Sequence, residues 1–137
     1  AETGHLVFGT LHTSSAAKTI DRIIDVFPAA EKGMVRSMLS ESLRAVISQS
    51  LMKKTGGGRM AAHEIMVATP AIRNLIREDK LHQVYSQMQI GQDKSGMVTM
   101  NQSLKKHVDT GAITAEVAMG YSNAPEELAT QLGMKVK

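Results

Sequence analysis

The sequence has no cysteine and no tryptophan among its 137 residues. Without cysteine, neither a disulfide framework nor a thiolate metal site can form, and a reducing compartment such as the cytosol is compatible with the chain. Aromatic residues make up only 3% of the sequence, which argues against a function in which nucleic-acid bases stack on aromatic rings. Ten methionines are present, so we expect a core of aliphatic and methionine side chains.

The chain also lacks a strong charge of either sign and a long apolar run. Sixteen basic and thirteen acidic residues leave a formal charge of +3, which is too small and too scattered to form a nucleic-acid-binding stripe. No apolar run approaches the roughly 20 residues of a transmembrane helix, and the N-terminus has no signal-peptide pattern. We therefore expect a soluble protein with no transmembrane segment and no nucleic-acid partner.

The N-terminus lacks an initiator methionine and leads almost at once into an apolar run, His5 to Leu11. This run is rich in strand-forming residues and predicts a buried β-strand. A core strand so close to the first residue indicates a piece of a longer chain.

Apolar residues at helical spacing predict two helices after this strand. The first extends from Ala16 to Phe27, with N-cap candidates before it and Pro28 after it. The second extends from about Ala30 to Ile47, with Met34 and Met38 on its buried side.

A β-hairpin and several helices are predicted for the rest of the chain. The hairpin joins strands 49–54 and 59–68 through Thr55 and three glycines, which supply the positive φ angles of a tight turn. Thr69 and Pro70 open the next helix as its N-cap and first residue. The helices are predicted over residues 71–79, 80–90, 99–108, 114–119 and 125–132, with a loop at 91–96.

Neither the glycines nor the histidines form a recognisable chemical motif. Gly91 and Gly96 have the spacing of two P-loop glycines, but Met97 and Val98 stand where a phosphate-binding loop needs Lys and then Ser or Thr. The five histidines lack the spacing of a helical zinc motif. We predict no metal site and expect hydrogen-bonded or solvated imidazoles at His63, His82 and His107.

His12 differs because it follows the apolar run, between Thr10 and Thr13. Open α/β sheets bind ligands at this end of their strands. Two interpretations of His12 remain open: an imidazole that binds an oxyanion or a polarised water, and a structural histidine at a strand end.

The helix after Pro70 has an apolar face and a charged face, as an ordinary amphipathic surface helix does. Arg73 and Arg77 lie one turn apart and repel each other slightly. This pair hints at an acidic partner or a subunit interface.

Several stretches resemble one known family. Residues 1–13, AETGHLVFGTLHT, resemble the histidine box of the secretion-type hexameric ATPases, and the continuation to Pro28 and residues 34–43 are similar to the type IV pilus retraction motors of that family. Residues 71–78 reproduce the AIRNLIRE motif that marks these motors. The sequence similarity is strong as far as about Asn101 and weak over the final helices.

The resemblance implies an α/β fold, namely the C-terminal part of a RecA-like P-loop ATPase domain with a β-hairpin and a C-terminal helical appendage. Residues 1–96 would complete the ATPase domain, and residues 97–137 would form the helical region. His5 and His12 would belong to the histidine box, with His12 sensing the γ-phosphate and with Thr10 and Thr13 close to the nucleotide. The residues implied to couple the ATPase cycle to retraction are Ala71, Ile72, Arg73, Asn74, Leu75, Ile76, Arg77 and Glu78.

The function implied is that of a homohexameric ATPase that powers type IV pilus retraction and twitching motility. It would use ATP and Mg²⁺, lie in the cytoplasm against the inner membrane, and dock on the platform protein of the pilus machine. This chain opens after the P-loop and the Walker B segment, so by itself it is expected to bind no nucleotide and to hydrolyse no ATP.

Two alternatives remain open. One is a paralogue: an accessory retraction ATPase, a pilus-assembly ATPase or a type II secretion ATPase. The assembly and secretion motors usually carry a tetracysteine zinc motif, which the absence of cysteine opposes. The other is a non-enzymatic domain that binds a protein partner through its helices.

Overall fold

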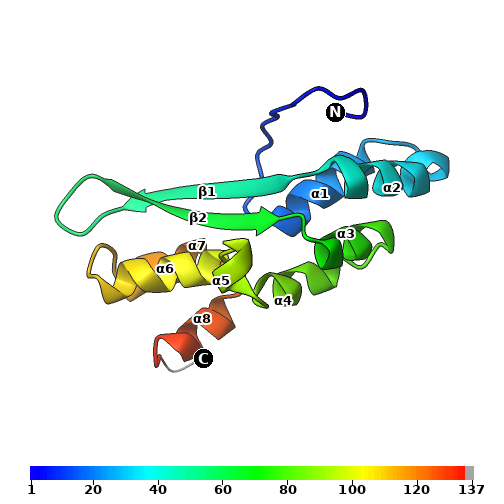
Figure 1. The fold of residues 1–137 in the computed structure, drawn as a ribbon. Coiled ribbons are helices and arrows are strands. Elements are labelled where there is room, and N and C mark those ends of the chain that lie inside the picture. Colours follow the sequence, from blue (N-terminus) through cyan, green and yellow to red (C-terminus); the bar gives the residue numbers. More distant parts are fainter. Residues whose placement is uncertain (135–137) are drawn as a thin grey trace.

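The computed structural model describes residues 1–134. Its helices pack against a two-stranded antiparallel β-hairpin. Its strands are β1 (Ala45–Lys53) and β2 (Arg59–Val67). Most of the helices cover one face of this hairpin, and α1 and α2 lie at the end where β1 begins (Figure 1). The alternation of buried and exposed residues along β1 agrees with a single covered face. The α/β class predicted from the sequence is confirmed.

The first two helices are α1 (Ala16–Asp25) and α2 (Lys32–Ser42), with a 3₁₀ turn, η1 (Ala29–Glu31), between them. The Ser15 hydroxyl caps α1 by accepting a hydrogen bond from the Lys18 backbone N–H. The prediction of a helix from residue 16 is confirmed.

The prediction that the second helix continues to Ile47 is wrong. Leu43 turns to an extended backbone with ψ of 132°, and β1 begins at Ala45. Apart from Arg44, residues 43 to 47 are apolar. They satisfy a strand pattern as well as a helical one, and pairing with β2 decides the outcome. Met34 and Met38 are exposed rather than buried.

The hairpin prediction is confirmed, with the first strand starting four residues earlier than expected. The register pairs Ala45 with Val67 and Lys53 with Arg59. Gly56, Gly57 and Gly58 all have positive φ angles in the turn, which explains the need for glycine there.

Helix α3 (Pro70–Arg77) begins as predicted, because the Thr69 hydroxyl accepts a hydrogen bond from the Ile72 N–H. The predicted helix at 80–90 is divided into η2 (Leu81–Gln83) and α4 (Val84–Met88), and the predicted loop contains one turn, α5 (Gln92–Ser95). The three predicted C-terminal helices are present as α6 (Met100–Asp109), α7 (Ala115–Tyr121) and α8 (Pro125–Gln131).

The core has two parts, and the hairpin contributes to both. Val46 and Met66 pack with α1, α3 and α4, whereas Met52 and Ala62 pack with the C-terminal helices. The division into residues 1–96 and 97–137 stays a prediction, and residues 135–137 lie outside the described part of the chain.

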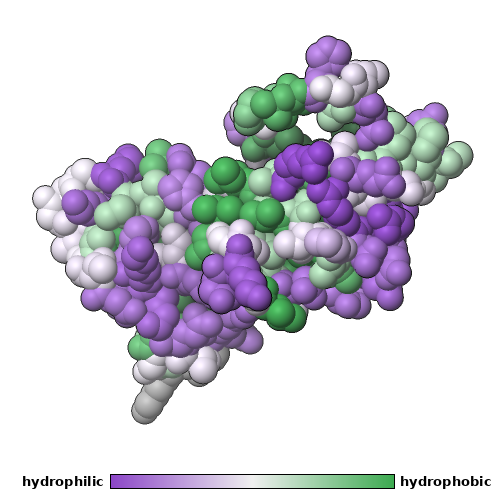
Figure 2. All heavy atoms as spheres, viewed as in Figure 1, coloured by the Kyte–Doolittle hydropathy of each residue, from purple (hydrophilic) through white to green (hydrophobic). Residues whose placement is uncertain are grey.

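The predicted buried strand at residues 5–11 is absent. This segment has no regular secondary structure, and the exposed fractions of Leu6 and Phe8 are 79% and 90%. Its apolar side chains form the green group at the top of Figure 2. A strand needs a neighbour to bond its backbone groups, and within residues 1–134 the two named strands pair with each other.

Candidate functional site

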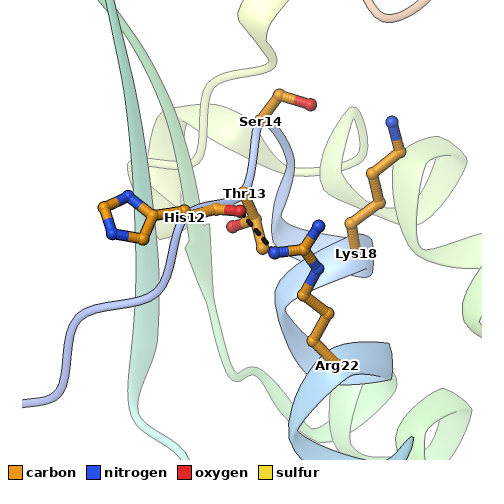
Figure 3. A pocket seen from close by; sticks show the side chains of 5 residues that line it. All are labelled: His12, Thr13, Ser14, Lys18 and Arg22. Carbon is orange, nitrogen blue, oxygen red and sulfur yellow. Dashed lines mark hydrogen bonds between the residues drawn. The ribbon is translucent and has the colours of Figure 1, made fainter.

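The turn that connects the N-terminal segment to α1 forms the wall of a pocket of about 450 Å³. The lining residues are His12, Thr13, Ser14, Lys18 and Arg22 (Figure 3). One guanidinium nitrogen of Arg22 donates a hydrogen bond of 2.7 Å to the His12 carbonyl oxygen, and this contact fixes the turn against α1. The imidazole of His12 points away from Arg22 in Figure 3.

The pocket has the chemistry of an anion site. Lys18 and Arg22 lie one turn apart on α1 and both face the pocket. Ammonium, guanidinium and hydroxyl groups all donate hydrogen bonds to phosphate or carboxylate oxygens. Neither basic residue was predicted as part of a site, although their i, i+4 spacing just after a helix N-cap was a usable signal in the sequence.

The structure brings only part of the predicted histidine box together. His12 and Thr13 line the pocket, and the Thr13 hydroxyl also hydrogen-bonds the Thr19 hydroxyl. His5 and Thr10 lie outside the pocket lining on the exposed segment, and the His5 ring bonds the Thr3 hydroxyl at 3.0 Å.

The predicted coupling helix, α3, divides into a buried face and an exposed face. Ile72 and Ile76 are fully buried in the core, and Leu75 packs against the same cluster. The exposed residues of the motif are Ala71, Asn74, Arg77 and Glu78.

Arg73 does not share the exposed face with Arg77. Its guanidinium donates to the carbonyl oxygens of Ser40 at 2.7 Å and Glu41 at 2.6 Å, at the C-terminal end of α2. Its Nε donates to the Ala68 carbonyl oxygen at 2.9 Å. The last carbonyls of a helix lack partners within the helix and carry partial negative charge. Arg73 therefore joins α2 to α3, a structural role that its place in the sequence did not predict.

Two of the remaining histidines have internal partners. The His63 Nε2 lies 2.8 Å from the Gln49 side-chain oxygen, and the His107 Nε2 lies 2.8 Å from the Ala61 carbonyl oxygen. Within the described residues, no group of three or more His, Cys, Asp or Glu side chains is placed to hold a metal ion. No helix in the same part of the chain has the length and apolar character needed to cross a bilayer.

Comparison with known proteins identifies the relatives of this chain. The family of type II/IV secretion system proteins matches residues 1–57. Over 92% of the chain, the sequence is 67% identical to the type IV pilus retraction ATPase PilT of Pseudomonas aeruginosa. The chain belongs to the type II/IV secretion family. A twitching motility protein of Neisseria gonorrhoeae in this family is 62% identical over 94% of the chain.

The fold agrees with this assignment to the secretion family. The crystal structure of the pilus retraction motor PilT with bound ADP superimposes with a TM-score of 0.85 at 53% identity, over 95% of this chain. The chain spans about a third of the length of these relatives: 36% of the Pseudomonas PilT, 34% of the Neisseria protein and 36% of the crystallised PilT chain.

The similarity within the secretion family is uneven. The type IV pilus ATPase PilU of P. aeruginosa is 36% identical over 93% of this chain. PilT of the same organism is almost twice as similar over a comparable span.

Proposed function

We propose that this chain is part of an ATP-driven motor that powers type IV pilus retraction and twitching motility. The observation that carries the proposal is the 67% identity to PilT over 92% of the chain. The higher similarity to PilT than to PilU favours the principal retraction motor over an accessory paralogue.

In this proposal the pocket beside α1 faces the phosphates of ATP. His12 acts as a γ-phosphate sensor, with Thr10 and Thr13 near the nucleotide and His5 in the same histidine box. The residues present can supply only some of the contacts that a bound nucleotide needs. Lys18 and Arg22 can hold phosphate oxygens, but the sequence contains no glycine-rich loop followed by Lys and then Ser or Thr to hold Mg²⁺ and the β- and γ-phosphates.

When bound, ATP and Mg²⁺ supply the phosphoryl group and the charge neutralisation for its transfer to water. The proposed contribution of this chain is the His12 imidazole at the edge of the pocket, on the far side of the turn from Arg22. An imidazole there can exchange a bond to phosphate oxygen for one to water, and so report hydrolysis.

The exposed face of α3 is proposed to couple this cycle to retraction. Asn74, Arg77 and Glu78 are free of the core, so they can contact a neighbouring subunit of a homohexamer or the inner-membrane platform protein on the cytoplasmic side. Ile72 and Ile76 hold the helix in place, which means that movement of the core moves this face.

The first test replaces His12 in the complete motor. We expect His12→Ala to lower the ATPase kcat by about tenfold or more, because loss of one donor to a developing oxyanion commonly costs 10²–10³. His82→Ala, at an exposed histidine of η2, is the matched control and should hydrolyse ATP at the wild-type rate. Normal turnover by His12→Ala would show that His12 is only structural. The 137 residues alone should show no Mg²⁺-dependent turnover.

The second test separates hydrolysis from retraction. Arg77→Ala should keep the ATPase rate within about twofold of wild type, because the side chain is exposed and, among residues 1–134, its hydrogen bond goes to Asn74 at 2.8 Å. The same variant should retract pili slowly or not at all in a force or motility assay. Wild-type retraction would remove Arg77 from the coupling role, whereas lost hydrolysis would place it in the ATPase machinery.

A further inference from the structure

A closed path of polar contacts connects the pocket turn to the C-terminal helices. It passes through Glu64, on β2, whose exposed fraction is only 3%. One carboxylate oxygen of Glu64 accepts from the backbone N–H of Ala16, the first residue of α1, at 3.0 Å. The other oxygen accepts from the N–H of Met100, the first residue of α6, also at 3.0 Å.

This placement explains why a carboxylate occurs in the interior. The first N–H groups of a helix lack partners within the helix and carry partial positive charge. One buried carboxylate satisfies two such helix ends at once. A neutral amide at position 64 can accept at only one oxygen, and its NH₂ group would face the second N–H.

A second connection lies on the surface beside the first. The Ser14 hydroxyl donates to the Asn123 side-chain oxygen at 3.1 Å, and the Asn123 side-chain nitrogen donates to the Ser14 carbonyl at 2.8 Å. Ser14 lines the pocket, and Asn123 lies just before α8. The pocket turn is therefore bonded to a residue 109 positions away in the sequence.

Buried Asn101 completes the path on the other side. Its side-chain nitrogen donates to the Ala124 carbonyl at 3.0 Å, and its side-chain oxygen accepts from the Ser122 hydroxyl. Asn101 follows Met100 in α6, and the Met100 N–H bonds Glu64. Asn101 therefore connects the Ser122–Ala124 turn before α8 to the same helix end that Glu64 holds.

We propose that Ser14, Glu64, Asn101 and Asn123 form a polar clasp that transmits the nucleotide state of the pocket to α6 and α8. The clasp rests on the proposed function, since it gives the C-terminal helices a regulatory role in the same ATPase cycle. A shift of the turn at residues 12–15 displaces Ser14 and the start of α1 together. Glu64 keeps both of its partners only if α6 moves with α1, and Asn123 keeps its pair with Ser14 only if the start of α8 follows.

The test compares hydrogen exchange of the complete motor with Mg²⁺–ADP and with a non-hydrolysable Mg²⁺–ATP analogue. In the wild type, exchange in α6 and at the start of α8 should differ severalfold between the two nucleotides. Asn123→Ala and Glu64→Gln should remove this difference while leaving the nucleotide-dependent difference at residues 12–15. Glu64→Gln should also raise exchange about tenfold at whichever of the Ala16 and Met100 N–H groups faces the amide NH₂, the effect of losing one charge-assisted hydrogen bond.

Glu126→Gln is the matched control, because this carboxylate is exposed on α8 and outside the clasp. It should behave as the wild type. If Glu64→Gln does not fold, Asn123→Ala alone decides the matter, because its bonds lie on the surface.

Three outcomes overturn the clasp. The first is a wild-type motor whose α6 and α8 do not respond to the nucleotide, while residues 12–15 do. The second is a response of α6 and α8 that persists in both variants. The third is a wild-type protein with no hydrolysis and no response at residues 12–15, which overturns the proposed function together with the clasp. The first two leave the proposed function intact.

Discussion

Arg73 and Arg77 are one helical turn apart in α3, but their surroundings differ. Arg73 reaches three carbonyl oxygens at Ser40, Glu41 and Ala68, whereas Arg77 is exposed and bonds Asn74. The i, i+4 spacing of the two arginines predicted that both lie on one charged face of α3. This spacing could not predict that the end of α2 lies beside Arg73, because that contact joins residues more than thirty positions apart.

We expect Arg73→Ala to lower the free energy of unfolding by about 1–3 kcal/mol, because it leaves carbonyl groups at the end of α2 without a charged donor. Arg77→Ala should change it by less than about 0.5 kcal/mol, as for other exposed side chains. Chemical denaturation of the two variants under identical conditions measures the difference. Equal effects would mean that Arg73 does not hold α2 to α3.

Among the elements, the hairpin shows how backbone conformation selects residues. Gly57 has a φ of 111° in the turn, whereas Gly33 has no positive φ within α2. A Cβ atom at either position would meet no atom within 4 Å. The difference between the two glycines is therefore one of backbone conformation and not of space.

Gly57→Ala should lower the free energy of unfolding by about 1–2 kcal/mol, since side chains with a Cβ are strained at positive φ. Gly33→Ala should raise it by about 0.5–1 kcal/mol, because alanine is the better helix former. Thermal unfolding followed by circular dichroism reports both shifts. Stabilisation by Gly57→Ala would contradict the turn conformation.

The ends of the elements were harder to predict than their existence. The cap residues predicted the starts of α1 and α3 well, because Ser15 and Thr69 act on backbone groups a few residues away. Thr99 caps α6 in the same way, although the sequence predicted it as the first residue of that helix. The end of α2 was missed because residues 43–47 fit a helix and a strand equally well. The segment at 5–11 has the composition of a strand but no neighbouring strand among the described residues.

At the scale of the molecule, the hairpin and a few polar contacts join the two parts of the core. One of these contacts lies between α4 and α8, where the Tyr85 hydroxyl donates to a Glu127 carboxylate oxygen at 3.0 Å. Burial and this bond to Glu127 raise the pKa of Tyr85 from 10.0 to about 12. The tyrosine is thereby kept in the protonated form that can donate.

The pH dependence follows from this raised pKa. In the unfolded chain Tyr85 loses its proton near pH 10, so its contribution to folding stability is complete below pH 10 and is lost as the pH rises toward 12. In a Tyr121→Phe background, Tyr85 is the one tyrosine left in the sequence, and its absorbance titration should have a midpoint near pH 12.

Glu127→Gln should lower that midpoint without restoring the ordinary value, because the carboxylate charge is removed while burial, the larger cause, remains. A midpoint near 10 in the Tyr121→Phe protein would show that Tyr85 is neither buried nor bonded to Glu127 in solution.

The sequence by itself determined what depends on near neighbours along the chain. This includes the helix starts, the glycine turn, the absence of thiolate chemistry and the motif at residues 71–78. The tertiary structure decided which side chains meet across the fold: Arg73 with the end of α2, Glu64 with two helix N-termini, and Ser14 with Asn123. Caps and turns act within a few residues, whereas these contacts require packed elements to bring distant parts of the chain within hydrogen-bond range.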